Sequence, residues 1–247
     1  AMLKRALSNL NGLDWDDPVP EAEQDFWKGQ LKLWPSLANL RIPRSAVPPG
    51  AIIPLQARLI CNTDASTTCA GACVYLSYRL SSGKWSSQLL TAKSRLVNYT
   101  VPRNELEAIV LGSELTFAVA TSLDLPFQSV TIASDSLVAI SWAMNEKARN
   151  KTFVFNRVLT VQRYLRWIRE MTTLTDEVEL AHVPGELNAA DCLTKGLISP
   201  SEVSGSSSWQ IGLEWMSRDV HLMPLTRYKD ITLSSEDVVK FLSETIS

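Results

Sequence analysis

The chain has 247 residues, of which 45% are hydrophobic and 20% charged, and its formal net charge is -2. These proportions are typical of a globular protein with a sizeable core in one or two domains, and they exclude a disordered chain. The acidic balance is unusual for a protein that binds nucleic acid by itself. It is compatible with weak binding, with a local basic patch, or with membership of a larger polypeptide.

The sequence also limits where the protein works. It has no unbroken run of about 18 apolar residues, the length that a membrane span needs, and no apolar signal segment at its start. The pair Cys69 and Cys73 share one face of an expected strand, where no tight turn could bring them onto one metal. We therefore read these two, with Cys61 and Cys192, as small buried hydrophobic residues in an intracellular, reducing setting.

Residues 1–56 form a distinct leader. An amphipathic helix is expected at residues 20–33, ended or kinked by Pro35. Its apolar positions fall at helical spacing: Phe26, Trp27, Leu31 and Trp34. Residues 42–54 are rich in proline and predict an extended connector.

The centre of the chain alternates between strand and helix patterns. Strands are expected at residues 57–64, 69–79, 85–95, 128–134 and 177–183. Helices are expected at residues 102–122, 136–145, 153–171 and 188–195. The short connections between the first three strands predict an antiparallel meander, and the later alternation favours parallel pairing. The pattern predicts an α/β fold with a mixed five-stranded sheet and helices on both faces. Beyond it, residues 199–208 predict a serine-rich linker and residues 235–245 a terminal amphipathic helix.

Four acidic residues occupy positions that such a sheet would bring together. Asp64 and Asp135 end expected strands, Glu105 opens a long helix, and Asp191 lies in the first turn of the last one. Taken singly, each has an ordinary interpretation as a turn residue, a helix N-cap or a partner of a helix dipole. Glu107 is a rival for the role of Glu105, but the two point about 200° apart on a helix, so only one can face the strand ends.

Together these residues indicate a metal site. Ligand sites in open α/β sheets gather at the carboxyl ends of strands. Carboxylates without histidine or cysteine suit hard ions such as Mg²⁺. Two such ions about 4 Å apart are a common device for displacing an oxygen at phosphorus.

The chain contains six short motifs in a fixed order: Thr63-Asp64-Ala65-Ser66, Ala92-Lys93-Ser94-Arg95, Pro102-Arg103-Asn104-Glu105-Leu106, Ser134-Asp135-Ser136, Phe153-Val154-Phe155-Asn156-Arg157-Val158 and His182-Val183-Pro184-Gly185-Glu186-Leu187-Asn188-Ala189-Ala190-Asp191. This series resembles the ribonuclease H domain of BEL/Pao-type LTR retrotransposon polyproteins. Residues 13–18 and 41–44 resemble the segment after the reverse-transcriptase core, and residues 208–215 resemble the tail before integrase. The resemblance covers residues 11–216.

The resemblance implies a ribonuclease H-like fold and metal-dependent endonuclease activity on the RNA strand of RNA–DNA hybrids during reverse transcription. Its metal-binding and catalytic carboxylates correspond to Asp64, Glu105, Asp135 and Asp191, holding Mg²⁺, with Mn²⁺ able to substitute. The products would carry a 5′-phosphate and a 3′-hydroxyl.

The same resemblance implies a domain organisation and a setting. Residues 1–56 would be a connection segment, residues 57–198 the ribonuclease H-like domain, and residues 199–247 a linker and extension toward integrase. The expected partners are the hybrid and the reverse-transcriptase and integrase regions of the same polyprotein, with no membrane. The expected location is intracellular, in cytoplasmic virus-like particles or in the nucleus.

One feature departs from cellular ribonucleases H, which carry a histidine in the loop before the last aspartate. The loop at residues 184–187 has none, so slow turnover is expected. His182 lies on the preceding strand, where we expect it to pack or to form hydrogen bonds.

Several residues are candidate contacts to nucleic acid: Ser66, Arg103, Asn104, Ser136, Arg157, Arg163 and Arg166. Arg163 and Arg166 point away from the apolar face of their helix, so they could contact phosphates or form a solvated face. Arg157 lies at the edge of that apolar face and needs a partner, either an acidic leader residue or the substrate.

Other functions remain open at this point. The chain could be a catalytically inactive ribonuclease H-like module, structural or nucleic-acid-binding, of the host-domesticated or connection type. An integrase or transposase would place a glutamate as its last carboxylate, which Asp191 opposes. A proofreading exonuclease would carry Asp-x-Glu on its first strand, which Asp64-Ala65-Ser66 lacks.

Overall fold

The structure is a computed structural model. It describes residues 12–14, 16–47, 50–52, 56–123, 125–145, 152–171, 178–195, 200–231 and 234. The helix expected at residues 235–245 lies outside these ranges.

The described residues form one six-stranded sheet in the order β3-β2-β1-β4-β5-β6. The strands are β1 (Ala57–Ala65), β2 (Cys69–Arg79), β3 (Trp85–Leu96), β4 (Phe127–Ser134), β5 (Val178–His182) and β6 (Thr226–Arg227). β2 pairs antiparallel with both β1 and β3, and β4 pairs parallel with both β1 and β5. The expected meander and parallel half are therefore both confirmed.

The expected number of strands was one too low. β6 adds a short antiparallel edge, in which Thr226 pairs with His182 and Arg227 with Ala181. A strand of two residues has no hydrophobic period, so its sequence gives no strand signal.

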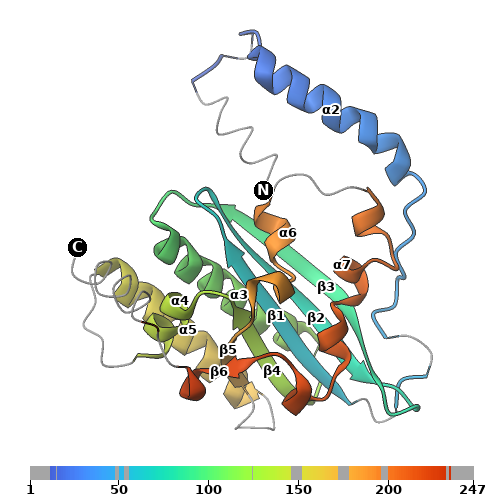
Figure 1. Cartoon of the computed structure of the whole chain (residues 1–247), viewed down its shortest axis with the longest axis vertical. Helices are drawn as coiled ribbons and strands as arrows, with labels where there is room; N and C mark the ends of the chain where they lie inside the picture. Colours follow the sequence, from blue (N-terminus) through green and yellow to red (C-terminus); the bar gives the residue numbers. More distant parts are fainter. Residues whose placement is uncertain are drawn as a thin grey trace.

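One face of the sheet is covered by long helices, α3 (Val101–Leu123), α4 (Leu137–Met144) and α5 (Thr152–Met171) (Figure 1). Alternate residues of β1, such as Leu59 and Cys61, belong to the buried cluster that these helices form with the sheet. By length and composition α3 could cross a membrane, but 61% of its most apolar stretch is buried inside the protein. That burial is typical of a core helix.

The opposite face is covered by short helical turns, most of them within residues 200–231, here called the extension (Figure 1). These turns are η1 (Gly185–Leu187), α6 (Asp191–Thr194), α7 (Ser208–Ile211), η3 (Glu214–Ser217) and η4 (Val220–Leu222). The extension also contains η2 (Pro200–Val203), which contacts α2 and α7, and η5 (Tyr228–Asp230), which packs against α4 and β5 on the helix-covered face. Ile60 of β1 shares a buried cluster with Trp215 and Met216 of the extension.

This face corrects two expectations. The helix expected at residues 188–195 is only the four-residue α6, because Asn188 adopts an extended backbone and separates it from η1. The stretch expected to be a linker at residues 199–208 contains η2 and the start of α7. Ser207 is the N-cap of α7, because its hydroxyl accepts a hydrogen bond from the Gln210 backbone amide. This serine therefore starts a helix and is not part of a flexible linker.

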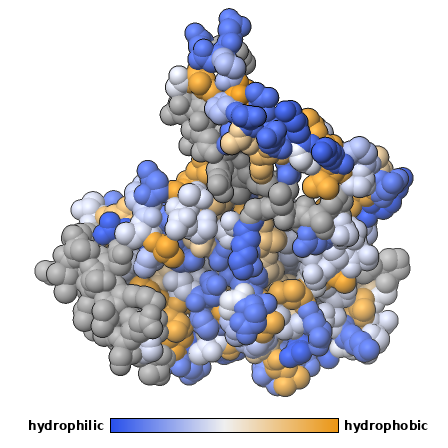
Figure 2. Space-filling view, turned by 45° about the horizontal axis from the view of Figure 1, so that its top comes forward, coloured by the Kyte–Doolittle hydropathy of each residue, from blue (hydrophilic) through white to orange (hydrophobic). Residues whose placement is uncertain are grey.

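The leader forms α2 (Glu21–Leu37), which stands away from the sheet (Figure 1). The helix was expected to end near residue 33, but it continues to Leu37 with Pro35 inside its last turn. The Ala38 amide, just after the helix, donates a hydrogen bond to the Pro35 carbonyl. Leu31 and Trp34 are about half exposed, and Figure 2 shows hydrophobic residues among hydrophilic ones on this projecting part.

Candidate metal centre

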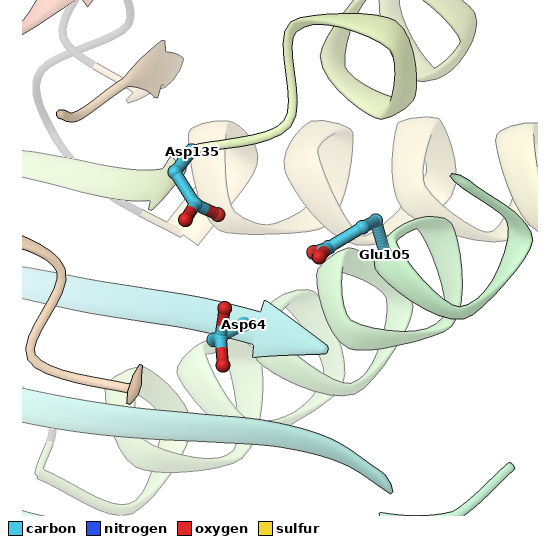
Figure 3. A group of neighbouring side chains, drawn as sticks. All are labelled: Asp64, Glu105 and Asp135. Atoms are coloured by element: carbon cyan, nitrogen blue, oxygen red, sulfur yellow. The ribbon is translucent and has the colours of Figure 1, made fainter. Parts of the chain in front are cut away.

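Three acidic side chains meet at the carboxyl edge of the sheet: Asp64 near the end of β1, Glu105 in the first turns of α3, and Asp135 just after β4 (Figure 3). One oxygen from each lies within 4.8 Å of the others. The parallel register pairs Thr63 with Ser134, so the next residue on each strand, Asp64 and Asp135, comes to the same edge.

The position of Glu105 depends on how closely α3 approaches β1. The Asn104 amide donates to the Ser66 carbonyl at 2.9 Å, and its oxygen accepts from the Tyr99 amide at 3.1 Å. Two turns further along, a Cβ added at Gly112 would lie 2.4 Å from the Thr63 methyl group. A glycine there lets the helix backbone pack directly against the strand.

Burial and mutual repulsion make the three carboxylates hard to ionise. Asp64 and Glu105 are 6% and 8% exposed. Burial, followed by the charges of Asp135 and Asp64, raises the pKa of Glu105 to about 9. Burial also raises the pKa of Asp64 to about 6, against the opposing effect of a hydrogen bond from Thr194. The pKa of Asp135 is raised by burial too, and the charge of His182 opposes that shift.

The donor set fits a divalent cation. Glu105 Oε2 and Asp135 Oδ1 are buried and have no hydrogen-bond partner among the described residues. Leaving such oxygens unpaired costs free energy that a bound cation would offset. All the donors are carboxylate oxygens, which hard ions such as Mg²⁺ prefer.

Asp191 lies at the rim of this group rather than within it. Its carboxylate is 2.6 Å from the ammonium group of Lys195, one helical turn away. It is still close enough for its charge to contribute to the raised pKa values of Asp64 and Asp135. The structure thus brings together three of the four expected carboxylates. The i,i+4 spacing of Asp191 and Lys195 could have indicated this ion pair from the sequence.

The segment that carries Asp191 is fastened to the end of β1. The Asn188 amide donates to the Thr63 carbonyl at 2.9 Å, and the Thr194 hydroxyl donates to the Asp64 carboxylate. Asn188 is not the N-cap of α6, a position that Ala190 occupies. Instead, it ties the loop to the strand edge.

Other residues take over the ordinary roles that the carboxylates could have had. Ser136, not Asp135, caps α4 by accepting a hydrogen bond from the Ala139 amide. The turn after β1 is closed by Ser66, whose hydroxyl accepts from the Thr68 and Cys69 amides. Neither helix capping nor this turn therefore accounts for Asp64 or Asp135.

Glu107 lies elsewhere on α3 and is 6% exposed. Its carboxylate accepts a hydrogen bond from Arg157 Nε at 2.8 Å and lies 3.9 Å from a guanidinium nitrogen of Arg95. Arg157 was expected to pair with an acidic leader residue or with the substrate. In the structure its partner is Glu107. The Arg157 guanidinium also stacks on Phe153 at 4.0 Å. Because α3 and α5 are far apart in sequence, local pattern alone could not pair them.

The other candidate contacts to nucleic acid differ in accessibility. Asn104 is fully buried, and Ser66 and Ser136 hold a turn and a cap. Arg103 lies 5.7 Å from the Phe153 ring. Arg163 and Arg166 are exposed on α5, and the Arg163 guanidinium lies 5.3 Å from the Trp167 ring.

His182 lies on the expected strand, and three of the four cysteines are buried as expected. His182 ends β5 and is partly buried. The loop at residues 184–187 contains η1 and carries no histidine. Cys61, Cys69 and Cys73 are buried and unbridged, and Cys192 is partly buried.

A comparison with protein families matches residues 2–136 to the Pao retrotransposon-like RNaseH-like domain. No curated protein matches the sequence. The similar solved structures include RNase H1 from the halophilic archaeon Halobacterium salinarum NRC-1, with 15% identity, a TM-score of 0.36 and coverage of 56% of this chain and 93% of that one. The N-terminal RNase H domain of Rv2228c from Mycobacterium tuberculosis has 12% identity and a TM-score of 0.38, and the match covers 56% of this chain and 91% of that one. LC11-RNase H1, solved with an RNA/DNA hybrid, has 16% identity, a TM-score of 0.37 and coverage of 56% and 93%.

Proposed function

Because the chain belongs to the family of Pao retrotransposon-like RNaseH-like domains and has a ribonuclease H-like fold, we propose that it is a nuclease for the RNA strand of RNA–DNA hybrids. The observation that carries this proposal is the buried group of Asp64, Glu105 and Asp135, whose oxygens lie within 4.8 Å of one another. A structural role would not require three carboxylates to be held so close together without a cation.

Each carboxylate has a defined part in this proposal. Asp64, Glu105 and Asp135 hold divalent cations, Mg²⁺ or Mn²⁺, at the strand ends. Such cations, when bound, activate a water molecule and stabilise the oxygen that leaves phosphorus. Asp191 becomes a further ligand of the cations when its ion pair with Lys195 breaks. In this scheme no side chain is needed as a nucleophile.

The substrate is longer than the site and needs contacts beyond it. Arg163 and Arg166 are exposed cations on α5 and would contact phosphates. RNA would be distinguished from DNA through its 2′-hydroxyl groups. We place the domain in a polyprotein between reverse-transcriptase and integrase regions, acting in cytoplasmic virus-like particles or in the nucleus.

The test is a cleavage assay on a labelled RNA–DNA hybrid with Mg²⁺, with Mn²⁺ and with a chelator. We expect cleavage by the wild type with either metal, and none by Asp135→Asn. Glu114→Gln serves as the matched control, because Glu114 lies on α3 but pairs with Lys93 and Arg95 on the surface. A well-folded wild type that binds the hybrid but cleaves it with neither metal would instead support an inactive binding module.

A further inference from the structure

A cavity of about 400 Å³ lies at the opposite end of β1 from the carboxylates. Arg58, which lines it, and Asp64 are six residues apart on that strand, a separation of roughly 20 Å. The sheet contributes one wall of the cavity and the extension contributes Asp219, Val220 and His221. The cavity therefore exists only where the extension packs against the sheet.

Arg58 is a buried cation with one unused nitrogen. Its side chain is 1% exposed, and its guanidinium lies 4.1 Å from the Trp85 ring. Nε donates to the Ser77 hydroxyl at 3.1 Å, and Nη2 donates to the Arg218 carbonyl at 2.7 Å and also to the Met216 carbonyl. Nη1 is buried and has no hydrogen-bond partner among the described residues. A buried guanidinium nitrogen without an acceptor is costly unless something else supplies one.

Cationic side chains outnumber anionic ones around this cavity. Arg58 and Arg79 line it together with His221, and the carboxylate of Asp219 opposes the two arginines. That carboxylate also accepts a hydrogen bond from the Trp85 indole at 3.0 Å. Burial lowers the pKa of Arg58 to about 10, and the nearby charge of Asp219 opposes this shift. An excess of cationic groups here contrasts with the net charge of -2 for the chain.

We propose that this cavity binds a phosphate group. Guanidinium groups donate charge-assisted hydrogen bonds to phosphate oxygens. Arg58 retains Nη1 for such a bond, and Arg79 contributes a second guanidinium to the lining. Ser129 and Gln128 also line the cavity and add a hydroxyl and an amide, so neutral donors stand beside the charged ones. The volume lies near the lower end of the range for ligand pockets, roughly 300–1,000 Å³, so there is room for more than a bare phosphate. Free phosphate, a nucleotide phosphate and the phosphate at the end of a nucleic-acid strand share the chemistry that this cavity would recognise.

The two histidines of the chain provide a built-in probe, because His221 lines the cavity and His182 lies beside Asp135. The experiment titrates metal-free protein at constant pH with inorganic phosphate and follows the histidine ring resonances by NMR. We expect His221 to shift with a saturable dependence and His182 to stay unchanged. Sodium acetate at the same ionic strength should leave both unchanged. No saturable shift at His221, or a shift at His182 instead, would overturn the proposal.

Variants separate this cavity from general charge effects. Arg79→Gln removes a cavity cation that is only half buried, and we expect phosphate binding to weaken about tenfold, the usual value of a charged hydrogen bond. Lys84→Gln is the control, because Lys84 is an exposed cation close in sequence that does not line the cavity. Equal binding by wild type and Arg79→Gln would contradict the assignment, as would equal weakening by both variants.

A second comparison identifies the source of the phosphate. Short DNA strands with a 5′-phosphate and with a 5′-hydroxyl are titrated under the same conditions. Tighter binding of the phosphorylated strand than of inorganic phosphate would assign the cavity to a nucleic-acid end. Equal shifts of His221 with both phosphate forms would assign it to a free or nucleotide phosphate. If the two strands shift His221 alike, the phosphate group is not what is recognised, and the proposal fails.

Discussion

Glu105 and Glu107 show how neighbouring residues of one type acquire different roles. Both are almost fully buried on α3, but only Glu107 has a cationic partner, Arg157. Glu105 faces Asp64 and Asp135, two groups of its own sign. A fold that keeps a carboxylate in this position loses stability at neutral pH unless a cation is bound.

This contrast predicts opposite effects for two isosteric variants. Glu105→Gln removes a repelling charge, so metal-free stability should stay level or rise, while metal-dependent cleavage is lost. Glu107→Gln leaves Arg157 with a weaker partner, so we expect a loss of about 1–3 kcal/mol of stability with cleavage retained. Thermal melts and hybrid cleavage, measured on both variants, check this. If Glu107→Gln were the variant without cleavage, the assignment of the site would be wrong.

The raised pKa values also predict how stability depends on pH. The pKa of Glu105 goes from 4.5 to about 9, and that of Asp64 from 3.8 to about 6, chiefly because burial disfavours the charged forms. The folded protein then holds more protons than the unfolded chain across this window, so these groups reduce stability as pH rises. Melting temperatures without metal should fall more steeply from about pH 5 to about pH 9 in the wild type than in Glu105→Gln. Saturating Mg²⁺ should remove most of this difference; an identical slope in both proteins without metal would refute it.

At the scale of elements, the long strands and helices could be predicted from their local residue patterns and from the turn residues between them. β1, β2 and α3 were located in this way to within one residue of their ends, although β1 and β2 are buried on both faces. The approach of three carboxylates followed from strand order, since Asp64 and Asp135 end adjacent parallel strands. What local pattern could not show was pairing between distant or irregular segments. The Glu107–Arg157 ion pair and the edge strand β6 are of this kind.

The contact between α3 and β1 is the element-level feature that sets the site geometry. Gly112→Ala would place a methyl group 2.4 Å from the Thr63 side chain, next to Asp64, and α3 would have to shift. Overpacking of this kind typically costs 1–3 kcal/mol, and here it also moves Glu105 away from the strand ends. We therefore expect lower stability together with a higher Mg²⁺ requirement for cleavage, measured by melting and by a metal titration.

A matched glycine provides the control for that prediction. Gly29 lies inside α2 with nothing within 4 Å of an added Cβ. Gly29→Ala should leave cleavage unchanged and favour the helix by about 0.5–1 kcal/mol. If Gly112→Ala behaved like Gly29→Ala, the close approach of α3 and β1 would not be setting the position of Glu105.

At the scale of the whole molecule, the extension replaces helices as the cover of one sheet face. Arg58 at the start of β1 bonds the carbonyls of Met216 and Arg218, and Tyr75 on β2 donates its hydroxyl to the Trp209 carbonyl at 2.8 Å. This segment has no recognisable hydrophobic period in the sequence, because its helical turns are only three or four residues long. It nevertheless contributes Trp215 and Met216 to a buried cluster with Ile60 of β1.

Trp215 is the residue through which the extension reaches the candidate metal centre. It is 2% exposed, shares a buried cluster with Ile60, and donates its indole N–H to the Leu187 carbonyl at 3.0 Å. Leu187 belongs to the turn just before Asn188, which is tied to the end of β1. Trp215→Ala therefore removes a large core side chain and a hydrogen bond that holds the loop leading to Asp191.

We expect Trp215→Ala to lower the free energy of unfolding by about 3–5 kcal/mol, as for other large core truncations. Leu222→Ala is the control within the extension, because the Leu222 side chain is 58% exposed. This substitution should change the free energy of unfolding by less than about 0.5 kcal/mol. Denaturant unfolding of the three proteins gives these values. At a temperature where Trp215→Ala stays folded, cleavage should need more Mg²⁺ than in the wild type, because the loop before Asp191 is less firmly held. A Trp215→Ala protein as stable as Leu222→Ala would show that the extension is an independent appendage and that the sheet does not need it as a cover.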